Sequence, residues 1–493
     1  MKKSEITVRK KLFLALGVVI NYGMTDNIYQ YEDNESSVIK SGNKYRSSDD
    51  YFDNDASVQL QEEEIKALKN AFISPYNHLQ DPIDLNMGLA DTRTESKETF
   101  HLGTSVIGNI NSPTQGQNRA YNTDIFQIWG QSSRVGGFAL GAGGTAVLNM
   151  NQTGQPNTFG TTSVFTLSQA YVDYQYSNKL QITGGAILLT TPWVNSFGSN
   201  PGATYAMGNN PYQGVIASVQ ALPSLLLTGF YAWNYMQYPN NWFNQQTYYN
   251  TMGGPLAGIG SSPTNGPAGL GMIWNPVDSY SGQLWFYNFD NYAQMVYFDN
   301  SYHIGLSSLF SLDISGQGFM QSSSASGLTN QVSLPGETSP AGVVASNGVG
   351  GKLALNIGNN TTSISYNNIF GSSGSYLNGG MVTPYTYGME IDPLYTTPAL
   401  TSLAELGSGF AYTLRNSTTF MDNTLKFNLS FSQFFVNQVY SSQPNLVTEY
   451  DAALLYRIPH TNMNVWTRMV YQDQGEAYGG ALWQPRVIFN WTY

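Results

Sequence analysis

The chain of 493 residues contains no cysteine. This absence excludes disulfide bonds, thiolate metal sites, a cysteine nucleophile and a lipid anchor on an N-terminal cysteine. Histidine is scarce too: the four histidines are scattered, and none has the spacing of a metal-binding pair. The sequence also lacks a G-x-S-x-G elbow, a Walker loop and an HExxH motif. We therefore expect neither an enzyme nor a bound cofactor, and metal ligands stay unknown.

Charge is missing from most of the chain. Of the 21 Lys and Arg residues, 12 lie in residues 1–100 and only 9 in the remaining 393; of the 32 Asp and Glu, 17 lie in residues 1–100 and 15 after it. A soluble protein has about a quarter of its residues charged, whereas this body is rich in Asn, Gln, Ser, Thr, Gly and Tyr. That mixture suits a polar lumen inside a lipid-facing band. The net charge of −11 argues against a nucleic-acid partner.

Long hydrophobic runs are absent as well. The apolar run of residues 12–20 follows a basic stretch that ends at Lys10 and Lys11, and it is too short for a membrane span of about 20 residues. This combination predicts a signal peptide over residues 1–23 and export to the bacterial outer membrane. Residues 24–98 are acidic, with one short helical pattern over residues 58–72. They form either a flexible periplasmic or surface segment, or a small plug inside a barrel.

Residues 99–493 show the two-residue alternation of β-strands. Leu425, Phe427 and Leu429, for example, alternate with Lys426 and Asn428. Short connections are predicted near residues 133–135, 177–178, 221–223, 276–279, 300–301, 358–360 and 458–460. Long ones are predicted near residues 111–120, 149–162, 190–209, 235–267, 315–348, 371–405, 436–446 and 472–481. Such alternation is typical of outer-membrane barrels, so we expect an all-β transmembrane antiparallel β-barrel of 16–18 strands.

The last segment adds a more specific signal. Val487, Phe489, Trp491 and Tyr493 share one face, while Arg486, Asn490 and Thr492 share the other, and Ile488 alone breaks the polar face. A terminal strand that ends on an aromatic residue is what the barrel-assembly machinery recognises. We therefore expect that machinery and outer-membrane lipid as partners, and a monomer as the functional form.

The alternation places five of the nine cations after residue 100 on the lumen side of adjacent strands. They are Arg415, Lys426, Arg457, Arg468 and Arg486. Glu449 and Asp451 fall on the same wall and are expected to pair with some of them. One interpretation is a salt-bridge network that braces the barrel. The other is an electrostatic guide for an anionic solute, because charged walls of low dielectric focus the field along a pore.

Aromatic residues crowd the predicted long connections. Beyond the predicted strand end lie Trp242, Phe243, Tyr248 and Tyr249, and the connection of 371–405 carries Tyr376, Tyr385, Tyr387 and Tyr395. They would suit an external platform for a ligand, because aromatic rings provide rigid contact area with a polar tip. Glu390 and Asp392 in the same connection could bind ferrous iron through oxygen ligands, or could simply be solvated charges.

Taken with the barrel and the acidic N-terminal segment, the stretches Thr191-Pro192-Trp193 and Pro211-Tyr212-Gln213-Gly214 resemble a family of outer-membrane iron-acquisition proteins. These are the siderophore porins similar to LbtU, together with the related FslE and FupA proteins. The resemblance implies uptake of iron, either as a ferric siderophore or as the ferrous ion. It brings no ligand residues with it.

Two other functions stay open at this point. A general diffusion porin would pass unrelated solutes without saturable binding. A surface adhesin or structural barrel would conduct no ions at all. An energy-coupled receptor is excluded by length, because such receptors need 22 strands around a large plug.

Overall fold

The computed structural model describes residues 99–113, 119–153, 163–177, 179–196, 210–236, 242–245, 247, 264–323, 342–386, 392–421, 424–437, 445–475 and 480–492. The predicted signal peptide, the acidic segment of residues 24–98 and Tyr493 lie outside these ranges, so the expectations about them stay predictions. Among the described residues, no helix is long and apolar enough to cross a membrane.

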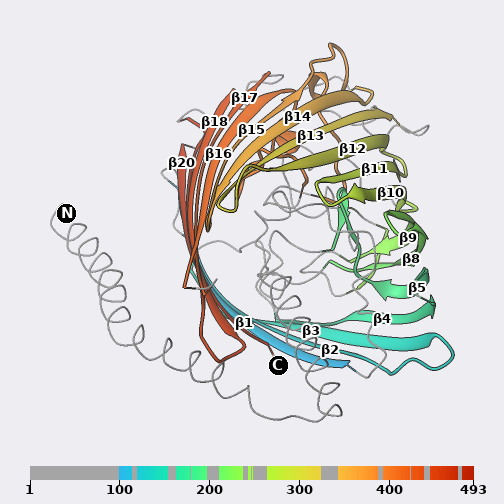
Figure 1. Cartoon of the computed structure of the whole chain (residues 1–493). Helices are drawn as coiled ribbons and strands as arrows, with labels where there is room; N and C mark the ends of the chain where they lie inside the picture. The colour runs from blue at the N-terminus through green and yellow to red at the C-terminus, as the bar shows by residue number, and fades with distance from the viewer. Residues whose placement is uncertain are drawn as a thin grey trace, which may run out of the picture. The chain divides into compact units, whose positions relative to one another are not determined.

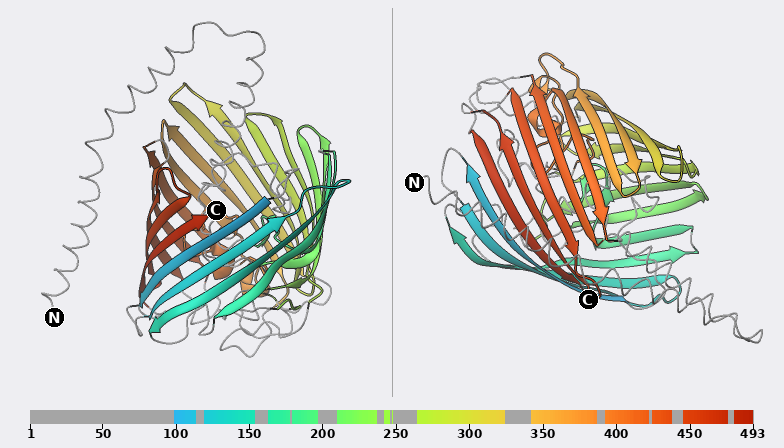
Figure 2. Two further views of the ribbon diagram at one scale, coloured as in Figure 1. Left: turned by 90° about the horizontal axis from the view of Figure 1, so that it is seen from below. Right: turned by 60° about the vertical axis from the view of Figure 1, so that its left-hand side comes forward.

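In the described part of the chain, eighteen antiparallel strands form one sheet that closes on itself, because β1 pairs with both β2 and β20. Figure 1 shows the resulting ring, and Figure 2 shows the inclined strands from two sides. The barrel predicted from the alternation is confirmed, at the upper end of the expected strand number. The strands are β1 (Thr99–Pro113), β2 (Arg119–Gln131), β3 (Phe138–Thr153), β4 (Val164–Tyr176), β5 (Leu180–Ile187), β8 (Tyr212–Leu222), β9 (Leu225–Tyr235), β10 (Pro267–Val277), β11 (Tyr280–Phe289), β12 (Ala293–Gly305), β13 (Phe310–Ser323), β14 (Ala345–Ile357), β15 (Asn360–Ile369), β16 (Gly409–Phe420), β17 (Leu425–Val436), β18 (Leu446–Arg457), β19 (Met463–Asp473) and β20 (Ala481–Thr492).

Most connections at one end of the barrel are short turns and most at the other end are longer, with the three-residue β11–β12 connection as an exception at the second end. Short turns at the periplasmic side and long loops outside are the rule for such barrels, so we call the two ends periplasmic and external. Several predicted boundaries were wrong. Asn300 and Ser301 pair within the sheet, and the turn comes at residues 306–309; the turns at 290–292 and 421–424 were missed; and β13 runs to Ser323, past the predicted start of a long connection at 315. Asn300 and Ser301 lie toward the periplasmic end of β12. Polar residues at such positions resemble a turn in sequence, which explains the first error.

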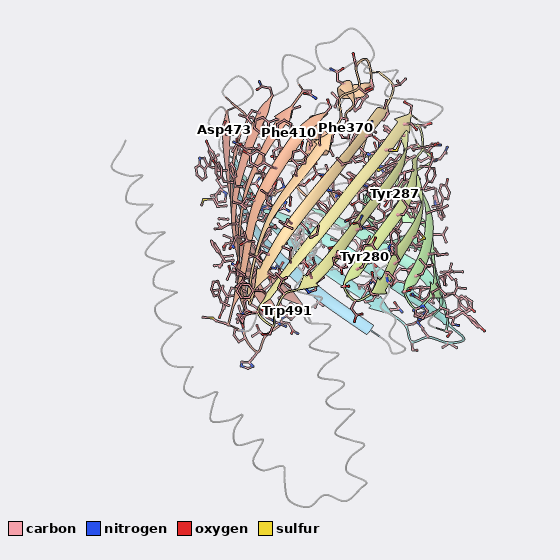
Figure 3. All side chains as sticks on the ribbon, turned by 45° about the horizontal axis from the view of Figure 1, so that its top comes forward. Tyr280, Tyr287, Phe370, Phe410, Asp473 and Trp491 are labelled. Atoms are coloured by element: carbon pink, nitrogen blue, oxygen red, sulfur yellow. The ribbon has the colours of Figure 1, made fainter. Side chains whose placement is uncertain are left out.

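Side chains on the outer face are apolar, and those on the inner face are mostly polar. Rings on the outer face of β15–β20 form a continuous row near the external end, with neighbouring centroids 4.6 to 6.2 Å apart: Tyr366, Phe410, Phe435, Tyr412, Phe431, Tyr450, Tyr471 and Trp483. Figure 3 shows Phe410 close to the rim that carries Phe370 and Asp473, with Trp491 toward the opposite rim. This is the aromatic belt expected where a barrel meets the membrane surface.

Two connections fold into the lumen instead of pointing outward. One is residues 188–196, which contain the hairpin of β6 (Thr190–Thr191) and β7 (Val194–Asn195). The other, which we call the inner loop, is the β15–β16 connection of residues 370–408, described except for 387–391, with η2 (Tyr376–Asn378) and α5 (Leu403–Leu406). Both join a large buried cluster with the inner face of β8, β9, β11 and β12, in which the biggest side chains are Trp193, Tyr212, Phe230, Trp285, Tyr287, Phe289, Tyr297, Tyr376 and Tyr385.

Ile488, the residue that broke the polar face of the last strand, has a structural explanation. It is fully buried in a second lumen cluster with Trp466, Ala453, Ile125 and Val147. These residues come from β2, β3, β18, β19 and β20, which are adjacent across the closure of the barrel. An apolar residue at an inward position therefore packs inside the lumen here and does not mark a shift of register.

Candidate functional site in the barrel lumen

The five predicted lumen cations all occupy inward positions. We call the set Arg415, Lys426, Arg457, Arg468 and Arg486 the cationic wall; it spans β16–β20, one cation per strand. All but Arg457 are buried. Lys426 and Arg457 lie near the periplasmic ends of their strands, while the other three lie midway along theirs. The inward placement predicted from the alternation is thus confirmed, whereas a role in binding solute is a separate matter.

The strongest concentration of positive charge is the pair Arg468 and Arg486. They are direct cross-strand partners in β19 and β20, and they are 3% and 4% exposed. The guanidinium of Arg468 lies 4.9 Å from the ring centre of Trp466, and Nη2 of Arg486 donates to Oε1 of Gln484 over 3.3 Å. Like charges directly opposite each other repel, and the electrostatic interaction of Arg468 with Asp451 offsets part of this repulsion.

Arg415 binds the inner loop, a contact that the sequence did not indicate. Its Nη1 donates to the carbonyl oxygen of Tyr395 over 2.9 Å, and its Nη2 donates to the carbonyl oxygen of Thr397. Both acceptors belong to the inner loop. The forked guanidinium therefore fastens the inner loop to β16, since one planar group reaches two carbonyls two residues apart.

The acidic residues of the wall also hold the inner loop. Glu449 accepts the backbone N–H of Leu400 over 2.7 Å and the hydroxyl of Thr401, and Asp451 accepts the hydroxyl of Ser430 over 2.6 Å. The expected pairing of these acids with the cations is supported for one pair, because Asp451 interacts electrostatically with Arg468. The backbone N–H groups of Ala399 and Leu400 in the inner loop also bind Asp451 and Glu449, and no local pattern indicated that a loop would reach them.

Three further anchors, all missed in the sequence, tie the inner loop to β12, β13 and β14. The amide of Gln321 in β13 forms two hydrogen bonds with the backbone of Val382, of 2.6 and 2.8 Å. The hydroxyl of Tyr395 donates to Asp299 in β12, and the ammonium of Lys352 in β14 lies 5.2 Å from the centre of the Tyr395 ring. The alternation of β14 would have placed Lys352 inward, but its partner lies in a loop and could not be inferred. The inner loop is therefore attached to β12, β13, β16 and β18 and crosses the lumen.

The tyrosines of this loop are not an external platform. Tyr376, Tyr385 and Tyr395 are at most 2% exposed and are packed inside the barrel. Tyr385 contacts the rings of Tyr212 and Tyr235, with centroids 6.1 and 5.7 Å apart. Burial raises the pKa of the Tyr385 hydroxyl, so it stays neutral. The expectation of solvent-facing aromatics in this connection was wrong for these residues, because the loop turns inward.

The remaining predicted site residues are spread apart. Asp392 is buried, and its Oδ1 accepts the N–H of Leu394 over 3.0 Å and the hydroxyl of Thr397 over 2.7 Å. Trp242 is exposed in the β9–β10 connection. Tyr248, Tyr249, Tyr387 and Glu390 lie outside the described residues. In the described ranges, no three His, Asp or Glu side chains come together to hold a metal ion.

A closed barrel of eighteen strands with an apolar belt and an inward-folded loop is the architecture of an outer-membrane porin. No family model matches the chain, and no curated protein matches it. Among solved structures it is similar to OpdL of Pseudomonas aeruginosa, at 15% identity and a TM-score of 0.61, over 81% of this chain and 99% of that one.

Two further Pseudomonas aeruginosa structures match in the same way. OccK9 (OpdG) is 13% identical with a TM-score of 0.64, and OccK8 (OprE) is 12% identical with a TM-score of 0.63; each match covers 80% of this chain and 98% of the other. At such identities the likeness shows the fold. The likeness supports the outer-membrane porin part of the sequence resemblance, and the narrower assignment to siderophore uptake stays a proposal.

Proposed function

We propose that the protein is an outer-membrane channel through which small anionic solutes diffuse along the cationic wall. The observation that carries the proposal is the gathering of five of the nine cations after residue 100 on five adjacent strands, all facing the lumen. A row of cations in a low-dielectric lumen lowers the energy of an anion along its path.

The burial of these side chains adds a condition to the proposal. Because Arg468 and Arg486 are almost fully enclosed, a solute reaches them only after the contents of the lumen shift. The inner loop is part of these contents. Hydrogen bonds and ring contacts hold it to the walls, and these contacts must break before the loop can move. The channel is therefore expected to open and close, and to spend part of its time in a poorly conducting state.

Conductance in planar lipid bilayers tests this function. In a salt gradient we expect the reversal potential of the full-length protein to report selectivity for anions. The double variant Arg468→Gln, Arg486→Gln should shift it toward cation selectivity. Lys179→Gln removes an exposed cation in the β4–β5 turn and should leave it unchanged. Absence of any conductance would support an adhesin or structural barrel, and unchanged selectivity of the double variant would refute the electrostatic guide.

An iron-bearing anion, such as a ferric complex of a carboxylate siderophore, is the narrower substrate that we propose. The sequence resemblance supports it, and its negative charge suits the cationic wall. A bare ferrous ion suits that wall less well, because like charges repel. Accumulation of radioactive iron, supplied as siderophore complex or as ferrous iron, would be compared in iron-starved cells with and without the gene. If neither form depends on the gene, while unrelated anions still permeate, the protein is a general porin.

A further inference from the structure

A recess of about 450 Å³ lies on the outer face of the barrel, away from the lumen. It is lined by Leu167 and Ala170 of β4, Gly185 and Ala186 of β5, Gln213 of β8, Trp233 of β9, and Phe243 of the β9–β10 connection. Each lining residue on a strand lies within about six residues of the external end of that strand. The recess is therefore close to the external rim.

The alternation of the strands shows that the recess opens toward the membrane. Ala170 and Ala186 are paired across β4 and β5, and the residues that follow them, Tyr171 and Ile187, belong to the buried lumen cluster. Leu167 is 57% exposed and Trp233 40% exposed on the outer face. The recess is thus continuous with the apolar belt that contacts lipid.

Small residues and a close strand approach create the recess. Gly185 has a φ of 132°, and a Cβ there would lie 2.3 Å from the carbonyl oxygen of Ala170, so no side chain fits at this position. The Gln213 amide oxygen accepts a hydrogen bond from Nδ2 of Asn234 over 2.7 Å. Two backbone hydrogen bonds of 2.8 and 3.0 Å between Asn244 and Tyr235 hold the segment that carries Phe243.

We propose that this recess binds one acyl chain of an outer-leaflet lipid. Among the described residues that line the recess none is charged, which suits a hydrocarbon chain better than a headgroup. Its volume has room for roughly fifteen groups of the size of a water molecule or a methylene, comparable to an acyl chain. Trp233 and Phe243 then flank the chain near the membrane surface, where aromatic rings are favoured.

Native mass spectrometry of the full-length protein tests the proposal. The purified barrel is exchanged into mild detergent containing palmitoyl-oleoyl-phosphatidylethanolamine. We expect the unmodified protein to retain one lipid more than Ala170→Phe, which fills the recess. Phe243→Ala, which removes one side of the recess without adding bulk, should also lose that lipid. The matched control is Ala452→Phe, an outward-facing alanine of β18 on a distant part of the barrel.

Equal lipid retention in all four proteins would overturn the proposal. A dimer or trimer that Ala170→Phe dissociates would also overturn it, by showing that a second copy occupies the recess. Each variant is first checked for the heat-dependent gel shift of a folded barrel. The anion selectivity of Ala170→Phe should equal that of the unmodified protein, so failure here is distinguishable from failure of the proposed channel function.

Discussion

Charged side chains that point into the lumen differ in the groups that they bind. Arg415 and Glu449 lie at strand positions where a polar lumen lining was expected, yet each binds backbone groups of the inner loop, and Asp392 binds a hydroxyl from within that loop. Hydrogen bonds to charged groups contribute about 1.5 to 3 kcal/mol each, more than neutral ones. A buried charged residue in this lumen is therefore as much an anchor as a contact for solute, and the two roles need separate tests.

Asp392 gives a prediction about pH. Burial raises the pKa of this carboxyl above its usual 3.8, and the nearby hydroxyls and Arg415 only partly offset that effect. The stability linked to the protonated form is complete below the unfolded pKa and is lost as the pH rises through the raised pKa. Asp392→Asn keeps the Oδ1 acceptor without the charge. The difference in Tm between variant and unmodified protein should be near zero at pH about 4 and should grow in favour of the variant toward pH 7.

The matched comparison removes the pH dependence of all other groups, because they are common to both proteins. Circular dichroism of the barrel at a series of pH values measures both melting temperatures. A difference in Tm that stays constant over this pH range would show that the pKa of Asp392 is the same in the folded and unfolded states.

At the scale of elements, the inner loop is the part whose attachment decides how the lumen is divided. It packs against the aromatic inner face of β8–β12 and is tethered to β18 by Glu449. The apolar contacts fix one side, and the polar anchors fix the other. Detachment of the polar side would widen the space beside the cationic wall without exposing the apolar cluster, so we expect movement to start there.

Glu449→Gln tests this view of the inner loop. The carboxyl group accepts the N–H of Leu400 on one oxygen and the hydroxyl of Thr401 on the other, whereas the amide has a single oxygen and loses one of these two bonds. A loss of about 0.5 to 1.5 kcal/mol makes the detached loop roughly two- to tenfold more populated relative to the attached one. Single-channel recordings should show a correspondingly larger fraction of time in the open state. Asp278→Asn, which removes an exposed acid from the β10–β11 turn, is the control; an identical open fraction in both variants would contradict the tether.

At the scale of the whole molecule, closure between the first and last strands defines the barrel. Val106 of β1 and Phe489 of β20 are direct partners on the outer face. Because the chain has no cysteine, a double variant Val106→Cys, Phe489→Cys carries the only two thiols. Paired Cβ atoms lie about 4.5 to 5.5 Å apart, close enough for a disulfide after a small adjustment.

We expect mild oxidation of that variant to produce a cross-link that alters its migration on a denaturing gel and that reductant reverses. Val106→Cys combined with Leu429→Cys of β17 places the second thiol on a distant strand and should not cross-link within the chain. A missing cross-link in the first variant, with the gel shift of a folded protein, would mean that β1 and β20 do not meet.

The sequence allowed the strand positions and the facing of most side chains to be predicted. Arg468 and Arg486 were placed inward correctly because alternation along a strand is a local property. Asn300 and Ser301 were mistaken for a turn because the same polar residues occur both in turns and near the periplasmic ends of strands. The contacts of Tyr395 with Asp299, and of Glu449 with Leu400, join residues far apart in the chain, and no local pattern contains them.

By itself, the sequence determined that the body of this protein is an antiparallel barrel with an apolar outer face and a polar inner face, because a two-residue period of apolar side chains leaves few other arrangements. Only the tertiary structure decided that the longest described connection turns inward. Aromatic loop residues such as Tyr385 can be buried either at a membrane surface or against the aromatic inner face of the barrel. That inner face forms only when the strands close into a ring, so no local pattern in the sequence shows which of the two occurs. The cationic wall was visible in the alternation, but its division into loop anchors and unassigned cations depended on where the inner loop lies.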